Sequence, residues 1–112
     1  MHYKKNVKEP WFSLIKNKQK IVEGRLNKGS SKEIKKNDII KWVNGEESVI
    51  TLIRRVTIYK NFKNYLEKEG LRNTLPHEKI NNINDGINVY YKYYSKEDEE
   101  KYGILAIQME VL

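Results

Sequence analysis

Lys20, Glu23 and Arg25 are the positions in this chain where closely spaced side chains could do chemistry together. A carboxylate between two cations is held ionised, and it fixes both cations in place. Arg25 could then present its planar fork to a phosphate or to the edge of a base. The alternative is an ordinary cluster of solvated ion pairs on an exposed strand, which the spacing alone favours.

The elements around these residues should bring two of them to one face. Pro10 suits the first position of a helix, and apolar residues recur after it at helical spacing, so a helix is predicted over residues 10–18. The alternation in residues 21–26 predicts a strand. Because side chains alternate across a strand, Glu23 and Arg25 should project from the same face.

The rest of the chain predicts a small curved sheet with helices at its ends. A loop rich in turn formers is expected over 27–37, and the Asn44-Gly45 pair predicts a hairpin turn. Strands that lie far apart in sequence must pair non-locally, which suits an α+β fold with a barrel-like sheet. The predicted strands cover 38–43, 49–58 and 104–112, and the predicted helices cover 61–70, 80–94 and 95–103. Asn61 and Ser95 are expected to cap the first and third of these helices, and Gly70 should end the first.

Length and charge limit the possible functions. A chain of 112 residues favours one domain, with residues 1–8 expected as a flexible extension. The net charge is +7, and residues 1–60 hold 15 Lys/Arg against 6 Asp/Glu, a balance of +9. Such asymmetry is typical of a protein that binds a polyanion. Lysines on a solvated face remain the alternative, because 18 of the 22 basic residues are Lys.

Several other classes of function are not expected. The chain has no Cys and only two, distant His residues, so neither a metal site nor a cofactor is predicted. The longest apolar runs are far below the roughly 20 residues of a membrane span. The N-terminal residues show no secretory signal, so we expect a cytoplasmic protein. We also expect a monomer.

The segment from Lys18 to Arg25 resembles the signature of the ASCH domain, Gly-x-Lys-x-x-Glu-x-Arg. Lys20, Glu23 and Arg25 match its charged positions, whereas Lys18 stands where the family has Gly. The pair Asn37-Asp38 resembles the family's Gly-Asp turn. The stretches 59–76, 90–95 and 101–107 are similar to a compact subgroup of archaeal and bacterial members, so the resemblance covers about residues 9–112.

This resemblance implies a PUA-like pseudo β-barrel of five to six mostly antiparallel strands, with three to four short helices packed at its ends and the motif lining a cleft. Relatives of this fold bind RNA or modified bases, so RNA or a modified nucleoside is the expected partner. The residues expected to contact nucleic acid are Lys18, Lys20, Arg25, Lys28 and Lys32. Trp42, Tyr90 and Tyr94 are further cleft candidates, although packing in the core is the simpler role for each.

Catalysis is the alternative that the resemblance raises. Some similar proteins hydrolyse an N-acetylated cytidine and another group cleaves RNA, which would make Lys20, Glu23 and Glu69 the catalytic candidates. Glu23 stands where the hydrolases have a nucleophilic Thr, and a carboxylate cannot replace that hydroxyl. We therefore expect a binding module first, an RNA-processing enzyme second and a protein-interaction or regulatory domain third. Whether the protein is an enzyme stays open.

Overall fold

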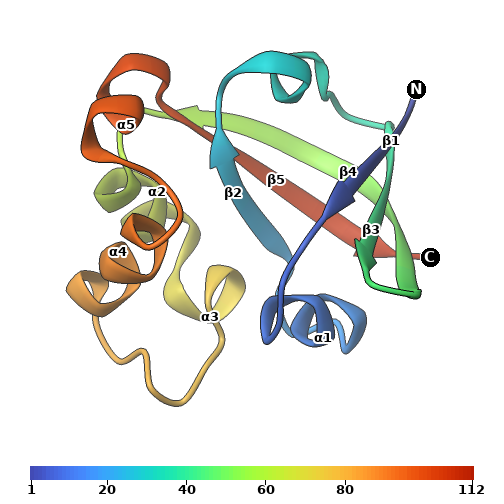
Figure 1. Ribbon diagram of the computed structural model, residues 1–112, viewed down its shortest axis with the longest axis horizontal. Coiled ribbons are helices and arrows are strands. Elements are labelled where there is room, and N and C mark those ends of the chain that lie inside the picture. The colour runs from blue at the N-terminus through green and yellow to red at the C-terminus, as the bar shows by residue number, and fades with distance from the viewer.

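The computed structural model covers residues 1–112 and shows a mixed five-stranded sheet that curves into a half-barrel (Figure 1). The strand order is β1-β3-β4-β5-β2. Only the pairing of β1 with β3 is parallel, and the other three pairings are antiparallel. The α+β class is thereby confirmed. The strands are β1 (His2–Asn6), β2 (Val22–Leu26), β3 (Ile39–Asn44), β4 (Glu47–Tyr59) and β5 (Ile104–Val111).

Five α-helices accompany the sheet, one more than the largest number expected. The additional helix is the single turn α3, which follows Gly70 directly and is too short to show apolar periodicity. A 3₁₀ helix, η1, occupies part of the predicted loop 27–37. In Figure 1, α2 to α5 lie together on one side of β2, while α1 lies on the other side of the molecule. The helices are α1 (Trp11–Lys16), α2 (Phe62–Glu69), α3 (Leu71–Thr74), α4 (Ile83–Tyr91), α5 (Lys96–Tyr102) and η1 (Gly29–Glu33).

The signals that predicted the starts and ends of two helices have the expected geometry. The side chain of Asn61 accepts a hydrogen bond from the main-chain N–H of Asn64 and caps α2. Ser95 caps α5 in the same way through the N–H of Asp98. Gly70 ends α2 with a positive φ of 89°, a conformation that glycine adopts at little cost.

The prediction of a flexible extension at residues 1–8 is wrong for most of its length. His2 to Asn6 form β1, which pairs in parallel with β3 from Ile39 to Val43. The segment carries adjacent lysines and few β-branched residues, so its sequence does not resemble a strand. Its order comes from main-chain pairing with β3 and from the packing of Tyr3 against the core.

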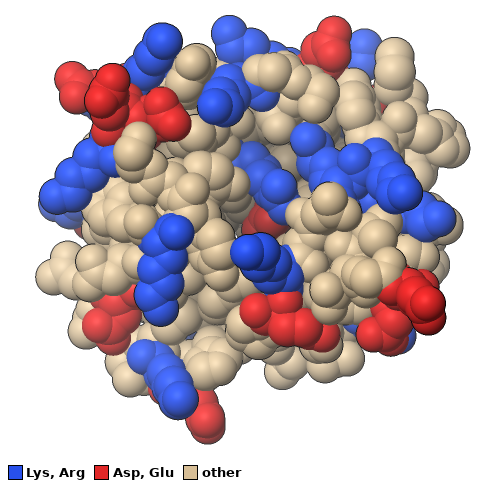
Figure 2. All heavy atoms as spheres, in the orientation of Figure 1, with Lys and Arg blue, Asp and Glu red and all other residues tan.

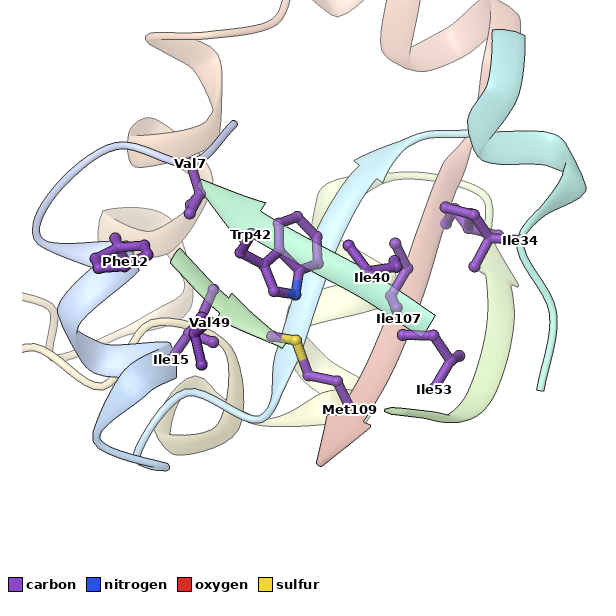
Figure 3. Packing of buried hydrophobic residues seen from close by; sticks show 11 residues of the cluster. Val7, Phe12, Ile15, Ile34, Ile40, Trp42, Val49, Ile53, Ile107 and Met109 are labelled. Atoms are coloured by element: carbon purple, nitrogen blue, oxygen red, sulfur yellow. The ribbon is translucent and has the colours of Figure 1, made fainter. Parts of the chain in front are cut away.

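Two apolar clusters share β5, whose side chains contribute alternately to one cluster and to the other. One fills the half-barrel around Trp42, Ile40 and Ile53 and includes side chains from α1 (Figure 3). The other lies between the sheet and the helices α2 and α4, around Tyr65. Trp11 packs against both clusters and so marks the boundary between them.

Candidate functional site

A cavity of about 210 Å³ lies beside Trp11, at the boundary between the two apolar clusters. The end of β1 and the start of α1 form one wall, β2 and the turn before it form the floor, and α4 with the residues that follow it forms the opposite wall. Two of the four sequence regions that contribute, residues 6–11 and Leu75, were not predicted to lie at the cleft. The lining residues are Asn6, Val7, Lys8, Trp11, Lys20, Glu23, Gly24, Arg25, Leu75, Val89, Tyr90, Tyr93 and Tyr94.

Lys20 is buried at the base of this cavity, and its ammonium group is fully occupied. Its Nζ donates to the main-chain oxygens of Val22, at 2.8 Å, and of Thr74. It also lies 3.2 Å from Oε1 of Glu23. Burial lowers the pKa of Lys20, and the attraction of Glu23 opposes that change. With three acceptors for its three hydrogens, Lys20 ties the start of β2 to α3 and has no donor left for a ligand.

Glu23 lies between the two cations, as expected, and it is buried, which the spacing did not predict. Oε1 contacts Lys20, and Oε2 accepts a hydrogen bond of 3.0 Å from Nε of Arg25. Burial disfavours the charged form, but Lys20 and Arg25 together hold the pKa of Glu23 below its ordinary value. The alternative of a solvated cluster on an exposed strand is wrong, because only 9% of the Glu23 side chain is exposed.

Arg25 is held at one end and unoccupied at the other. Nη2 lies 3.0 Å from Oε2 of Glu23 and donates a 2.8 Å hydrogen bond to the main-chain oxygen of Asn6. Its guanidinium carbon lies 5.4 Å from the centre of the Trp42 ring. Burial alone would lower the pKa of Arg25, but the attraction of Glu23 opposes this effect, and the pKa lies above its ordinary value. Nη1 has no partner within the chain, so a ligand in the cavity could accept its hydrogen bonds.

Aromatic side chains line the side of the cavity opposite β1. Tyr90 is buried, stacks on Phe62 at a ring distance of 4.7 Å, and shares a 2.9 Å hydroxyl contact with Tyr65. Tyr94 stacks on the same Phe62 ring at 5.8 Å, is half-buried, and its hydroxyl has no partner within the chain. Tyr93 is 48% exposed at the rim. Tyr90 is thus mainly a packing residue, whereas Tyr93 and Tyr94 offer surface to a ligand.

Two other predicted residues do not line the cavity. Glu69 is bound by both terminal nitrogens of Arg55, at 2.6 and 2.9 Å, and by the hydroxyl of Tyr59 at 2.6 Å. These donors, Arg55 foremost, lower the pKa of Glu69. Trp42 is buried in the half-barrel, where its indole N–H donates to Oγ1 of Thr51. Neither side chain is placed to touch a molecule in the cavity.

The three predicted surface lysines also lie away from the cavity. Lys18 borders a separate hollow beside Met109 and adopts a left-handed φ of 69°. The ammonium of Lys28 lies 5.1 Å from the centre of the Tyr102 ring, and Lys32 is exposed on η1. Besides Lys20 and Arg25, the basic residue that lines the cavity is Lys8.

Sequence reasoning missed the contribution of the N-terminal segment. Asn6 and Lys8 lie in the expected extension, and Trp11 lies in the helix predicted over 10–18 without a predicted role at the site. No periodicity marks the parallel edge strand that brings Asn6 to Arg25. The exposed Tyr93 sits beside the predicted Tyr94 and carried no separate signal.

Charged side chains are distributed unevenly over the surface around the cavity (Figure 2). Figure 2 shows basic side chains across one face of the molecule, with basic and acidic atoms together at its hollowed centre.

No group of three or more His, Cys, Asp or Glu side chains is arranged to hold a metal ion. No helix is both long and apolar enough to span a membrane.

Comparisons with known proteins agree on the family. The sequence model of the ASCH domain matches residues 6–112. The crystal structure of the hypothetical protein PH0355 is similar over 100% of both chains, with 36% identity and a TM-score of 0.92. The solution NMR structure of protein PF0455 from Pyrococcus furiosus is 37% identical over 100% of this chain and 98% of that one, with a TM-score of 0.81. Both neighbours are archaeal, from Pyrococcus, and no curated protein matches. The chain therefore belongs to the ASCH domain family.

Proposed function

We propose that this ASCH domain binds RNA by taking one nucleobase, plain or modified, into the cavity between β1, β2 and α4. The single observation that carries this proposal is the state of Arg25. Its Nε and Nη2 are held by Glu23 and by the main chain of Asn6, while Nη1 is unoccupied at the cavity. A guanidinium fixed in this way can donate to a base carbonyl or a phosphate without first losing freedom of its own.

The size and lining of the cavity support a single base. At about 210 Å³ it is smaller than the roughly 300–1,000 Å³ of a pocket for a drug-sized ligand. Tyr94 and the partly buried Trp11 supply flat apolar surface, and bases stack on aromatic side chains irrespective of sequence. The family is generally linked to RNA binding, which is consistent with this chemistry.

The charge of the site also favours an anionic ligand. Lys20, Glu23 and Arg25 together leave one net positive charge at the cavity, and Lys8 adds a second at its rim. A cavity with apolar walls concentrates such a field and attracts the phosphates that accompany a nucleotide.

Tryptophan fluorescence tests this proposal directly, because the chain has only two Trp residues. Trp11 lines the cavity and Trp42 is buried in the half-barrel. In a Trp42→Phe variant, titration with random-sequence single-stranded RNA hexamers should quench Trp11 emission in a saturable way. The matched Trp11→Phe variant, which emits from Trp42, should change little. Saturable RNA binding without a change in Trp11 emission would place the ligand elsewhere.

A hydrolytic enzyme is the second candidate, and one observation favours it. Lys20 and Glu23 lie 3.2 Å apart at the cavity, and burial lowers the pKa of Lys20. Lys20 could stabilise developing negative charge if substrate binding freed one of its hydrogens. The test is incubation with total RNA and a panel of modified nucleosides. Turnover by the wild type that Lys20→Met abolishes would establish catalysis in place of simple binding.

A further inference from the structure

A second and larger hollow adjoins the cavity. This second hollow measures about 460 Å³ and shares Trp11, Val89 and Tyr93 with the first. It lies between the start of α1, the loop between α3 and α4, and the outer face of α4. The two hollows therefore adjoin, with Trp11 and Tyr93 at the junction, and together they are called the groove.

The second hollow differs from the cavity in chemistry. Its walls are more polar, and they carry two exposed lysines, Lys79 from the loop before α4 and Lys92 just after α4. Asp85 is the carboxylate among its lining residues, and it accepts a hydrogen bond of 3.3 Å from the N–H of Asn81. The balance is one net positive charge, which suits an anionic phosphate.

The junction between the hollows is built of aromatic surface. Tyr93 is 48% exposed, which is high for a large aromatic side chain next to a cavity. Trp11 is held by the edge of the His77 ring, at a centroid distance of 6.3 Å. Figure 1 shows α1 and the loop between α3 and α4 toward the lower edge of the molecule. Exposed aromatic rings between basic side chains are the arrangement that single-stranded nucleic acids stack on.

We infer that the groove is a two-nucleotide site of an RNA polymer, in which the base next to the captured one stacks on Tyr93 and its phosphate meets Lys79 and Lys92. This inference rests on the proposed function, and it specifies that the ligand is an oligonucleotide rather than a free nucleoside. The cavity takes in one base, and the second hollow holds the adjoining nucleotide without reading its sequence.

The test compares two probes, nucleoside 5′-monophosphates and a labelled random-sequence RNA hexamer, against matched variants. The groove variant is Lys79→Gln/Lys92→Gln. Its control is Lys36→Gln/Lys41→Gln, which removes the same charge from two exposed lysines that border none of the described hollows. Arg25→Gln reports on the cavity alone.

For the hexamer, the groove variant should make the slope of log affinity against log salt less steep by about 0.7, since the two lysines neutralise one phosphate and each phosphate of a single strand contributes about 0.7. Tyr93→Ala should weaken the hexamer roughly tenfold. The control variant should keep the wild-type salt slope, and the groove variant should bind monophosphates like the wild type.

Other outcomes separate the two proposals. If the groove variant binds the hexamer like its control while Arg25→Gln weakens both probes, the two-nucleotide site is overturned and the base cavity stands. If hexamer binding needs the groove lysines but not Arg25, the base cavity is overturned. Competition by a glutamate decapeptide as strong as by unlabelled hexamer would overturn RNA as the ligand, and failure of the wild type to bind either probe would overturn both proposals.

Discussion

Arg25 of β2 donates a 2.8 Å hydrogen bond to the main-chain oxygen of Asn6 at the end of β1. These are the two edge strands of the sheet, which do not pair with each other through their main chains. A side chain therefore joins the two edges of the half-barrel at the point where the cavity opens. The same guanidinium that is proposed to bind the ligand also holds the walls of its site, so binding and local stability should be coupled.

Replacement of Glu23 should cost more stability than replacement of an exposed carboxylate. Glu23→Gln leaves the buried ammonium of Lys20 without its counter-charge, and loss of one partner of a buried pair costs about 3–5 kcal/mol. Glu46→Gln, an exposed carboxylate without a partner, is the matched control and should change the free energy of unfolding by less than about 0.5 kcal/mol. Urea unfolding of the two variants measures the difference, and equal costs would show that the Lys20–Glu23 pair does not stabilise the fold.

The dependence of stability on pH should weaken in the same variant. The pKa of Glu23 is lowered in the folded chain from its ordinary value of 4.5. Its stabilising contribution is therefore complete above about pH 4.5, and it is lost as the pH falls through the folded pKa. Between pH 5 and pH 3, roughly the span around that ordinary value, the wild type should lose more stability than Glu23→Gln. Parallel curves for the two proteins would mean that Glu23 is not held ionised by folding.

Lys18 stands where the family motif has Gly, and the structure shows the conformational reason for that Gly. Its φ of 69° lies in the left-handed region, which costs a residue with a side chain roughly 1–2 kcal/mol. Lys18→Gly should therefore raise the free energy of unfolding by about 0.5–1 kcal/mol, after allowance for the greater flexibility of glycine in the unfolded chain. Thermal unfolding should show a Tm higher by about 3 °C.

The neighbouring residue provides the control for Lys18. Asn17 has an ordinary φ of −78°, so Asn17→Gly should lower stability and not raise it. A loss of stability in both variants would mean that the left-handed turn at Lys18 carries no strain.

Gly24 should tolerate no side chain, because Tyr65 lies against it. An added Cβ would meet Cζ of Tyr65 at 2.7 Å, closer than real Cβ atoms approach. Gly24→Ala should displace the Tyr65 ring, disturb its 2.9 Å contact with Tyr90 and cost about 1–3 kcal/mol. In a Tyr65→Leu background, where the obstructing ring atoms are absent, the same substitution should cost less. The same cost in both backgrounds would exclude the Tyr65 contact as the cause.

Local patterns predicted the elements well, because their signals are contained in neighbouring residues. The Asn61 and Ser95 caps, the Asn44-Gly45 turn and the alternation through Glu23 and Arg25 all act within a few positions. The residues that complete the site could not be found in this way. Asn6 reaches Arg25 only because β1 pairs in parallel with β3, and that pairing is a main-chain interaction with no periodic signature.

Glu69 is the reverse case, a residue that the sequence suggested for the site but that does not line the cavity. Its place in the sequence suggested a catalytic partner for Lys20, but Arg55 and Tyr59 satisfy both of its oxygens outside the cavity. Spacing along the chain could not reveal this, since Arg55 lies next to the register shift of β4 against β5 and its direction depends on that irregularity.

The affinity of single-stranded RNA for Arg25→Gln, compared with Arg54→Gln, tests the central claim most directly. Arg54 is exposed on β4 and pairs only with Glu110, so the control removes the same charge away from the cavity. Fluorescence anisotropy with a labelled random-sequence RNA hexamer should show at least a tenfold loss for Arg25→Gln, about 1.4 kcal/mol, at a temperature where thermal unfolding confirms that both variants are folded. Arg54→Gln should bind nearly as the wild type does. Equal affinities for the two variants would contradict a ligand site at Arg25.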